Sequence, residues 1–164
     1  MNKATFQGLF KAEVSQNWSM VAPFKQLIYD LAAWVYRATH GEFITATLAT
    51  TLTHEDSGKT ILMPAIDNTV IALPAAAATE VGTTFQFIYT GGDAGAKVSI
   101  SPAAADAIHG TITLAATVVE LNGTDNKDLI LTKASATTGN SVKLVSDGVQ
   151  GWYVVNSTGI WASE

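Results

Sequence analysis

His40, His54 and His109 are the histidines of this chain, and they are the first side chains to consider for metal binding. A zinc site needs two or more ligands at a short fixed spacing and another ligand that converges from elsewhere in the chain. Glu55 and Asp56 follow His54 directly, but three adjacent residues of a turn cannot all point at one ion. We therefore expect this cluster to form a solvated turn. His40 is expected to lie at the end of a helix, near the negative end of its dipole.

Two polar segments share some residue types with known ligand-binding loops. Residues 122–128 carry oxygen ligands at alternating positions, but they lack the distal glutamate of an EF-hand, and Lys127 would place a positive charge beside a calcium ion. Residues 91–97 are rich in glycine and end in lysine, but Val98 follows where a phosphate loop needs serine or threonine. We interpret the first segment as a polar loop between strands and the second as the tip of a hairpin.

Residue patterns typical of catalysis are also missing from the sequence. The chain has no G-x-S-x-G motif and no cysteine, and no histidine and acid can be assigned to any serine as a triad. Nothing marks a pair of carboxylates of the kind that hydrolyses glycosidic bonds. We therefore expect a protein that is not an enzyme and that carries no metal and no cofactor.

The composition limits the classes of partner. Of the 164 residues, 48% are hydrophobic and only 14% are charged, which favours an oligomer with a buried interface. The net charge of −5, with Lys and Arg scattered singly, argues against a nucleic-acid partner. Lys25, Asp30 and Arg37 interrupt the best candidate for a membrane span, so we expect no membrane partner. The N-terminal residues lack the apolar core of a secretory signal, which indicates synthesis inside the cell.

Residues 1–41 differ in pattern from the rest of the chain. They begin with a polar arm that carries isolated large apolar residues: Phe6, Leu9, Phe10, Val14 and Trp18. Apolar residues then recur at alternating spacings of three and four, which predicts an amphipathic helix over about residues 23–38. The stripe on this helix consists of Val21, Phe24, Ile28, Leu31 and Val35. Gly41 is expected to end the helix. We interpret this segment as a unit for attachment or oligomerisation.

Residues 42–164 consist of short apolar runs separated by turn residues at regular spacing. This pattern predicts a mainly β domain, either a β-sandwich or a jelly-roll-like barrel. The strands are expected at residues 43–48, 60–63, 68–73, 83–89, 97–101, 111–114, 118–121, 129–133, 142–146 and 153–155. The breaks include Asn122-Gly123 and Asp147-Gly148. The alanines that follow Pro74 indicate a crossing loop or a single helical turn.

The end of the chain predicts a β-hairpin. Residues 142–146 and the strand that opens on Trp152 and Tyr153 flank a Ser-Asp-Gly turn, in which glycine supplies a positive φ at no steric cost. Because neighbouring residues of a strand point to opposite faces, only one of the two aromatic residues can face the core. We expect Trp152 to be an anchor of the β-domain, either in the core or at an oligomer interface.

The order of four segments in this domain resembles the head decoration (cement) proteins of tailed bacteriophages. The matching segments are residues 52–61, 69–75, 82–88, and 142–148 with Trp152-Tyr153-Val154. Together they span roughly residues 50–155, about two-thirds of the chain. Each segment alone is mostly strand-and-turn pattern, and the signal lies in their order and spacing. The N-terminal arm and helix have no counterpart in this resemblance.

The resemblance implies a structural protein of the virion, assembled in the host cytoplasm. It implies a homotrimer on the outer surface of the head, where the protein would bind the major capsid protein and stabilise the shell. The helical stripe would then pack either on its own β-domain or in a three-helix seam around the trimer axis. A seam of two heptads is too short to associate alone, so the β-domains would have to contribute.

The sequence is also consistent with a second function. The same kind of β-module occurs in tail-fibre and receptor-binding proteins of phages, which would bind host-surface glycans through exposed tryptophan and tyrosine. The copy number in the virion separates the two readings, because a decoration protein is present in hundreds of copies and a fibre protein in far fewer.

Overall fold

The computed structural model describes residues 26–32, 42–114, 117–125 and 127–163. The chain divides into two compact units, Met1–Glu42 and Phe43–Glu164. Within the described residues, no helix has the length and apolar character needed to cross a bilayer.

In the N-terminal unit, residues 26–32 are helical, and they lie inside the helix predicted over residues 23–38. Two members of the predicted stripe fall here: Ile28 is half-buried, and Leu31 is 57% exposed in the single chain. The remaining predicted residues lie outside the described part of the chain. They are Phe6, Leu9, Phe10, Val14, Trp18, Val21, Phe24, Val35 and His40.

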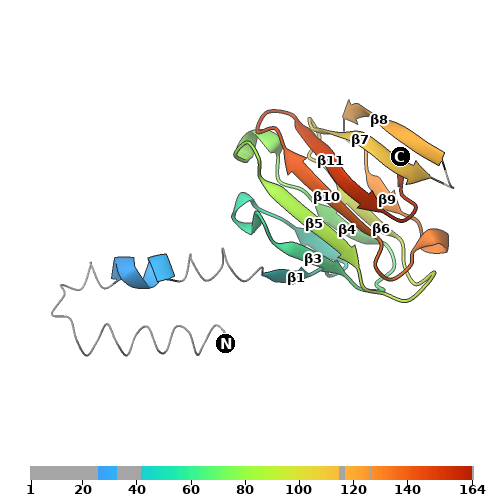
Figure 1. Cartoon of the computed structure of the whole chain (residues 1–164), viewed down its shortest axis with the longest axis horizontal. Helices are drawn as coiled ribbons and strands as arrows, with labels where there is room; N and C mark the ends of the chain where they lie inside the picture. Colours follow the sequence, from blue (N-terminus) through green and yellow to red (C-terminus); the bar gives the residue numbers. More distant parts are fainter. Residues whose placement is uncertain (1–25, 33–41, 115–116, 126, 164) are drawn as a thin grey trace. The chain divides into compact units, whose positions relative to one another are not determined.

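The C-terminal unit is built from two β-sheets, so the predicted mainly β fold is confirmed (Figure 1). Among the described residues the first sheet has seven strands. In spatial order they are β1 (Phe43–Thr45), β3 (Thr60–Met63), β5 (Thr84–Tyr89), β10 (Ser141–Ser146), β11 (Gly151–Thr158), β7 (Ala107–Leu114) and β8 (Thr117–Asp125). The second sheet has five: β12 (Ala162–Ser163), β9 (Leu129–Leu131), β6 (Val98–Ser101), β4 (Thr69–Ala72) and β2 (Ala49–Thr51). Of the two predicted architectures, the structure is therefore the β-sandwich, with its core between the two sheets.

The first six strands form three stacked coils. Successive strands alternate between the two sheets, so each coil contributes one strand to each sheet. β1, β3 and β5 are parallel to one another, as are β2, β4 and β6. Parallel neighbours need a long crossover connection, and here each crossover is the strand of the opposite sheet. The sequence pattern predicted the strands but not this parallel stacking.

The remaining strands extend the sheets mostly by antiparallel pairing. β10 pairs antiparallel with both β5 and β11, which confirms the predicted closing hairpin. β11 then pairs parallel with β7, and β7 pairs antiparallel with β8. On the second sheet β9 and β12 are added in antiparallel fashion beyond β6. Short 3₁₀ turns η1 (His54–Asp56), η2 (Ala76–Ala78) and η3 (Lys133–Ser135) lie between strands. Of the two alternatives expected after Pro74, a crossing loop or a single helical turn, η2 is the helical turn.

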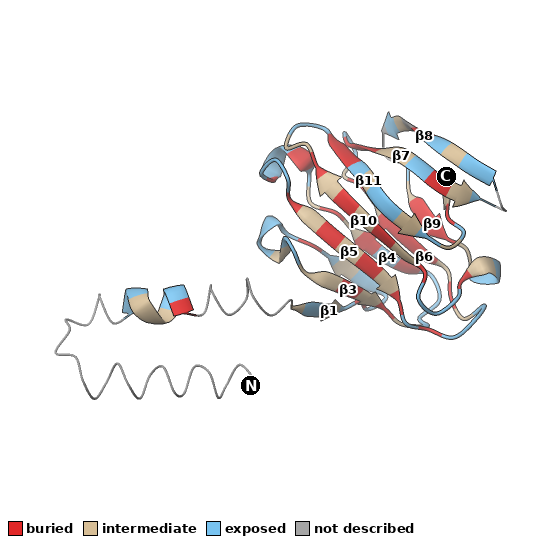
Figure 2. Ribbon diagram, viewed as in Figure 1, coloured by how far each residue is buried: buried red, intermediate tan, exposed pale blue. Residues whose placement is uncertain are grey.

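Alternation of buried and half-buried residues along β3, β5 and β10 shows how the core is filled (Figure 2). The inward ladder of the first sheet runs across four strands through Ile44, Ile61, Phe87 and Val142. Trp152 is fully buried, with its ring centroid 5.4 Å from that of Phe85. The predicted anchor residue therefore lies in the core of the single chain.

Asp106 stabilises the connection between β4 and β5, which contains η2. Its side chain is buried, and Oδ2 accepts a hydrogen bond of 2.7 Å from the backbone N–H of Ala76 at the start of η2. We expect Asp106→Ala to lower the free energy of unfolding by about 1–3 kcal/mol, because a buried N–H loses its acceptor. Urea denaturation would measure this change. Asp93→Ala, which removes an exposed acid, is the control and should change stability by less than about 0.5 kcal/mol. Equal effects of the two variants would contradict the structural role of Asp106.

Candidate functional site

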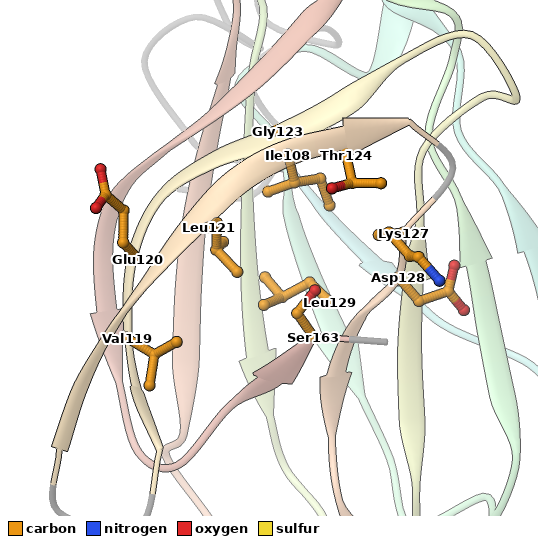
Figure 3. Close-up of a pocket in the computed structure, with 10 residues that line it drawn as sticks. All are labelled: Ile108, Val119, Glu120, Leu121, Gly123, Thr124, Lys127, Asp128, Leu129 and Ser163. Carbon is orange, nitrogen blue, oxygen red and sulfur yellow. The ribbon is translucent and has the colours of Figure 1, made fainter.

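Two cavities are candidates for a functional site. The first, of about 170 Å³, opens between the two sheets where the β7–β8 hairpin lies over β9 and β12 (Figure 3). Its buried walls are Ile108, Leu121 and Leu129, while Lys127 and Asp128 lie together at one end. The second, of about 300 Å³, is bordered by residues of β7, β8 and β11 and by the turn before β11. The two cavities share Gly123 in their linings.

The first cavity contains part of the segment that sequence analysis compared with a calcium loop. That segment was expected to be a polar loop, but β8 continues as a strand through Asp125, so the expectation was wrong for its first half. The ladder with β7 is irregular here: His109 pairs with Asn122 and Ala107 with Asp125, which leaves one extra residue on β8. Gly123 lies within this bulge, with a φ of +63°. Among the described residues, no group of three or more His, Cys, Asp or Glu side chains is placed to hold a metal ion.

The acidic cluster after Thr53 stabilises its own turn. Asp56 Oδ2 accepts hydrogen bonds from the Thr53 N–H (2.9 Å) and hydroxyl (3.0 Å), and Oδ1 forms an ion pair of 2.7 Å with Lys59. Burial opposes ionisation, but the hydrogen bonds from Lys59 and Thr53 outweigh it, so the pKa of Asp56 is lowered. His54 and Glu55 are exposed, as expected for a surface turn.

The glycines of residues 91–97 serve close packing. A Cβ on Gly91 would lie 2.5 Å from the Tyr89 hydroxyl oxygen, and one on Gly95 would lie 2.7 Å from it. Tyr89 is fully buried, and its hydroxyl donates a hydrogen bond of 3.2 Å to the Gly92 carbonyl. The segment was expected to be a hairpin tip, but it connects β5 and β6, which belong to different sheets.

The second cavity is bordered by the predicted Ser-Asp-Gly turn. Asp147 Oδ1 accepts three backbone hydrogen bonds, from the N–H groups of Val149 (2.8 Å), Gln150 (3.0 Å) and Gly151 (2.9 Å). Gly148, the next residue, has a φ of +73°, as expected of a glycine in a tight turn. The turn thus holds the carboxylate in one orientation at the start of β11.

Three side chains converge beside this turn. His109 of β7 is paired in register with Tyr153 of β11, and their rings stack with centroids 4.9 Å apart and planes inclined by 14°. A Cβ on Gly151 would lie 3.1 Å from Asp147 Oδ2, 3.1 Å from Tyr153 Cε2 and 3.2 Å from His109 Cδ2. A Cβ on Gly123 would come within 1.9 Å of the imidazole ring. The two glycines therefore leave the space that the histidine and its neighbours occupy.

This cluster is not apparent in the sequence, because His109 and Asp147 are far apart in the chain. One signal was present: Trp152 and Tyr153 must face opposite sides of β11, so a buried Trp152 places Tyr153 outside. The structure confirms this alternation, since Trp152 is fully buried and Tyr153 is 41% exposed.

The hydrogen bonds to Asp147 predict a dependence of stability on pH. The backbone hydrogen bonds from Gly151 and Val149 are the main cause that lowers the pKa of this carboxyl in the folded protein. The hydrogen bond from Gln150 and the electrostatic interaction with His109 contribute, and burial opposes them. A lowered pKa contributes stability that is present above the ordinary pKa of about 3.9 and is lost as the pH falls through the folded value. We expect Asp147→Ala to cost about 1 kcal/mol at pH 7, as for other side chains that cap backbone N–H groups.

Denaturant titrations at several pH values would measure this effect. The difference in unfolding free energy between wild type and Asp147→Ala should be constant near neutrality and should shrink as the pH is lowered below about 4. A difference that stays constant down to pH 2 would contradict the role of the ionised carboxylate.

Comparison with known proteins adds no identification. No family model matches this chain, and no curated protein matches it in sequence. The case for a function therefore rests on the motifs of the sequence and on the geometry described above.

Proposed function

We propose that this protein is a structural component of a tailed-bacteriophage virion, a decoration protein that binds the outer surface of the head as a homotrimer and stabilises the shell. In this proposal the partners are the major capsid protein and two further copies of the chain. The proposal follows from the resemblance of residues 50–155 to head decoration proteins.

The observation that carries the proposal is that the four segments of the resemblance pack against one another. Residues 82–88 contain β5, and residues 142–148 contain β10, which pairs with β5 so that Leu144 lies opposite Phe85. Phe85 also contacts Trp152 of the last segment. Residues 52–61 lead into β3, and residues 69–75 contain β4; both strands belong to the neighbouring coil. The segments therefore belong to one core, and this supports treating them as one module in the proposal.

The N-terminal unit is the proposed region of attachment and trimerisation. Of the proposed seam residues in the described helix, Leu31 is 57% exposed and Ile28 is half-buried, and Leu27 beside them is 60% exposed, so this helix carries apolar surface for packing. The arm before this helix carries the residues proposed to contact the shell: Phe6, Leu9, Phe10, Val14 and Trp18.

The copy number of the chain in its virion tests the proposed location. Quantitative mass spectrometry of purified particles should give hundreds of copies, in a simple ratio to the major capsid protein. A few to tens of copies would instead indicate the tail-fibre or receptor-binding reading. Analytical ultracentrifugation of the full chain should give the mass of a trimer, and a monomer at all accessible concentrations would contradict the proposal.

Substitution in the arm tests the mode of attachment. We expect Phe10→Glu in the full-length chain to weaken binding to expanded capsids by tenfold or more, since burial of a phenylalanine contributes about 1.5–3 kcal/mol. Gln7→Glu adds the same charge at a polar position and is the control, with an expected change of less than about twofold. Cosedimentation with capsids would measure both. Equal binding by the two variants would show that the arm does not hold the shell.

A further inference from the structure

The strand register places an aromatic pair on the solvent face of the seven-stranded sheet. Ile108 and Trp152 are paired between β7 and β11, and both belong to the core. The next pair along these strands, His109 and Tyr153, therefore faces the opposite side of the sheet. Tyr153 remains 41% exposed although the imidazole stacks on its ring.

A carboxylate oxygen is directed to the same place. The three backbone hydrogen bonds of Asp147 all use Oδ1, and no hydrogen bond in the described part of the chain uses Oδ2. Oδ2 borders the space above Gly151, which it shares with the rings of Tyr153 and His109. The turn thus fixes one carboxylate oxygen and presents the other to the cavity.

Gln150 supplies a further oriented polar group. Its Nε2 donates a hydrogen bond of 3.1 Å to the Ala105 carbonyl, while Oε1 has no partner among the described residues. The cavity is therefore lined by an aromatic surface together with a carboxylate, an amide, a phenol and an imidazole. These groups offer both hydrogen-bond donors and acceptors.

This combination matches the chemistry of a neutral sugar. A sugar hydroxyl donates a strong hydrogen bond to a carboxylate, and the C–H groups of the sugar ring pack on an aromatic surface. An anionic ligand is disfavoured by Asp147 and by the net charge of −5. An organic cation would use the carboxylate and the ring, but it would leave the donor groups without partners. The volume of about 300 Å³ is at the lower end of small-molecule sites, which suits one sugar ring.

We propose that the cavity formed by His109, Asp147, Gln150 and Tyr153 binds a single neutral sugar residue of a glycan. The site belongs to the β-domain and involves none of the N-terminal residues proposed to contact the capsid. The proposal is therefore independent of capsid attachment, and it would hold equally for a decoration protein and for a fibre protein.

The test is a titration of the full-length, ¹⁵N-labelled protein with methyl glycosides of glucose, galactose, mannose and N-acetylglucosamine. At least one glycoside should shift the backbone amide signals of His109, Gly151 and Tyr153 in a saturable manner, with a Kd in the millimolar range. Choline and sialic acid serve as the cationic and anionic probes and should not shift these signals. Saturable binding of either charged probe without any neutral glycoside would overturn the proposal, as would the absence of saturable shifts with all probes.

Two variants test whether the sugar binds at Tyr153 and Asp147. Tyr153→Ser removes the aromatic surface and should weaken binding at least tenfold. Asp147→Asn keeps an oxygen that can accept the backbone hydrogen bonds but removes the charge, and it should weaken binding about threefold to tenfold. Val155→Ser, at an exposed position on the same strand, is the matched control and should bind like the wild type. If both site variants kept wild-type affinity while their spectra showed a folded domain, the sugar would bind elsewhere and the proposal would be wrong. Capsid binding by these variants should be unchanged, which separates this result from a failure of the proposed function.

Discussion

Replacing Trp152 by alanine is expected to lower the free energy of unfolding by about 3–5 kcal/mol. The indole is fully buried, and its ring is tilted by 31° against that of Phe85, so it packs the closing hairpin against β5 of the coils. Removing it deletes a large apolar surface and leaves a cavity at the point where β11 joins the rest of the core. Because domains of this size are stable by only about 5–15 kcal/mol, this single change should bring the domain close to unfolding.

Urea denaturation followed by circular dichroism would measure this effect at a fixed protein concentration, so that oligomerisation does not change between samples. Trp152→Phe is the matched variant. It keeps an aromatic ring and removes Nε1, the one buried side-chain polar atom in the described chain that lacks a hydrogen bond. The phenylalanine variant should therefore be clearly more stable than the alanine variant. If the two were equally destabilised, loss of packing would not explain the result.

Trp161→Ala should also cost about 3–5 kcal/mol, but for a partly different reason. Trp161 is fully buried. Its backbone N–H donates a hydrogen bond of 2.8 Å to the Thr113 carbonyl of β7, which alanine would retain. Its indole Nε1–H donates another, of 3.1 Å, to the Thr158 carbonyl at the end of β11. The side chain thus stabilises the segment that connects β11 in one sheet to β12 in the other.

The same denaturation experiment tests this expectation, with Ile160→Ala as the control. Ile160 is the neighbouring residue and is 37% exposed, so its truncation should cost much less. Hydrogen exchange adds a local readout, because the amides that pair β12 with β9 should lose protection in Trp161→Ala. Protection that is unchanged at β12 would contradict the role of Trp161 in holding this strand.

The positions of most strands could be predicted because their signals are local. β3 has the predicted bounds; β5, β6 and β10 differ from the prediction by one residue at one end, and β4 differs by one residue at each end. β2 and β12 were missed, since three and two residues are too short to show an alternating pattern. Their extended conformation comes from pairing with β4 and β9, which is a tertiary effect.

The longer strands show where a local turn signal misled the prediction. Asn122-Gly123 is a favoured sequence for a tight turn, but β8 runs through it and forms a bulge against β7. The glycine is needed there for its positive φ and for the space taken by the His109 ring. An Asn-Gly pair can thus form either a tight turn or a bulge within a strand, and here pairing with β7 determines that it forms a bulge.

By itself, the sequence determined a mainly β domain after residue 41, its closing hairpin, and a core position for either Trp152 or Tyr153, because alternation along a strand and turn chemistry depend on near neighbours. The tertiary structure alone decided that the first six strands stack as parallel coils, since parallel and antiparallel strands have the same side-chain alternation. It also brought His109 beside Asp147 and Tyr153, through the parallel register of β7 and β11. Contacts between distant segments depend on register, and register is fixed only when the whole core is packed.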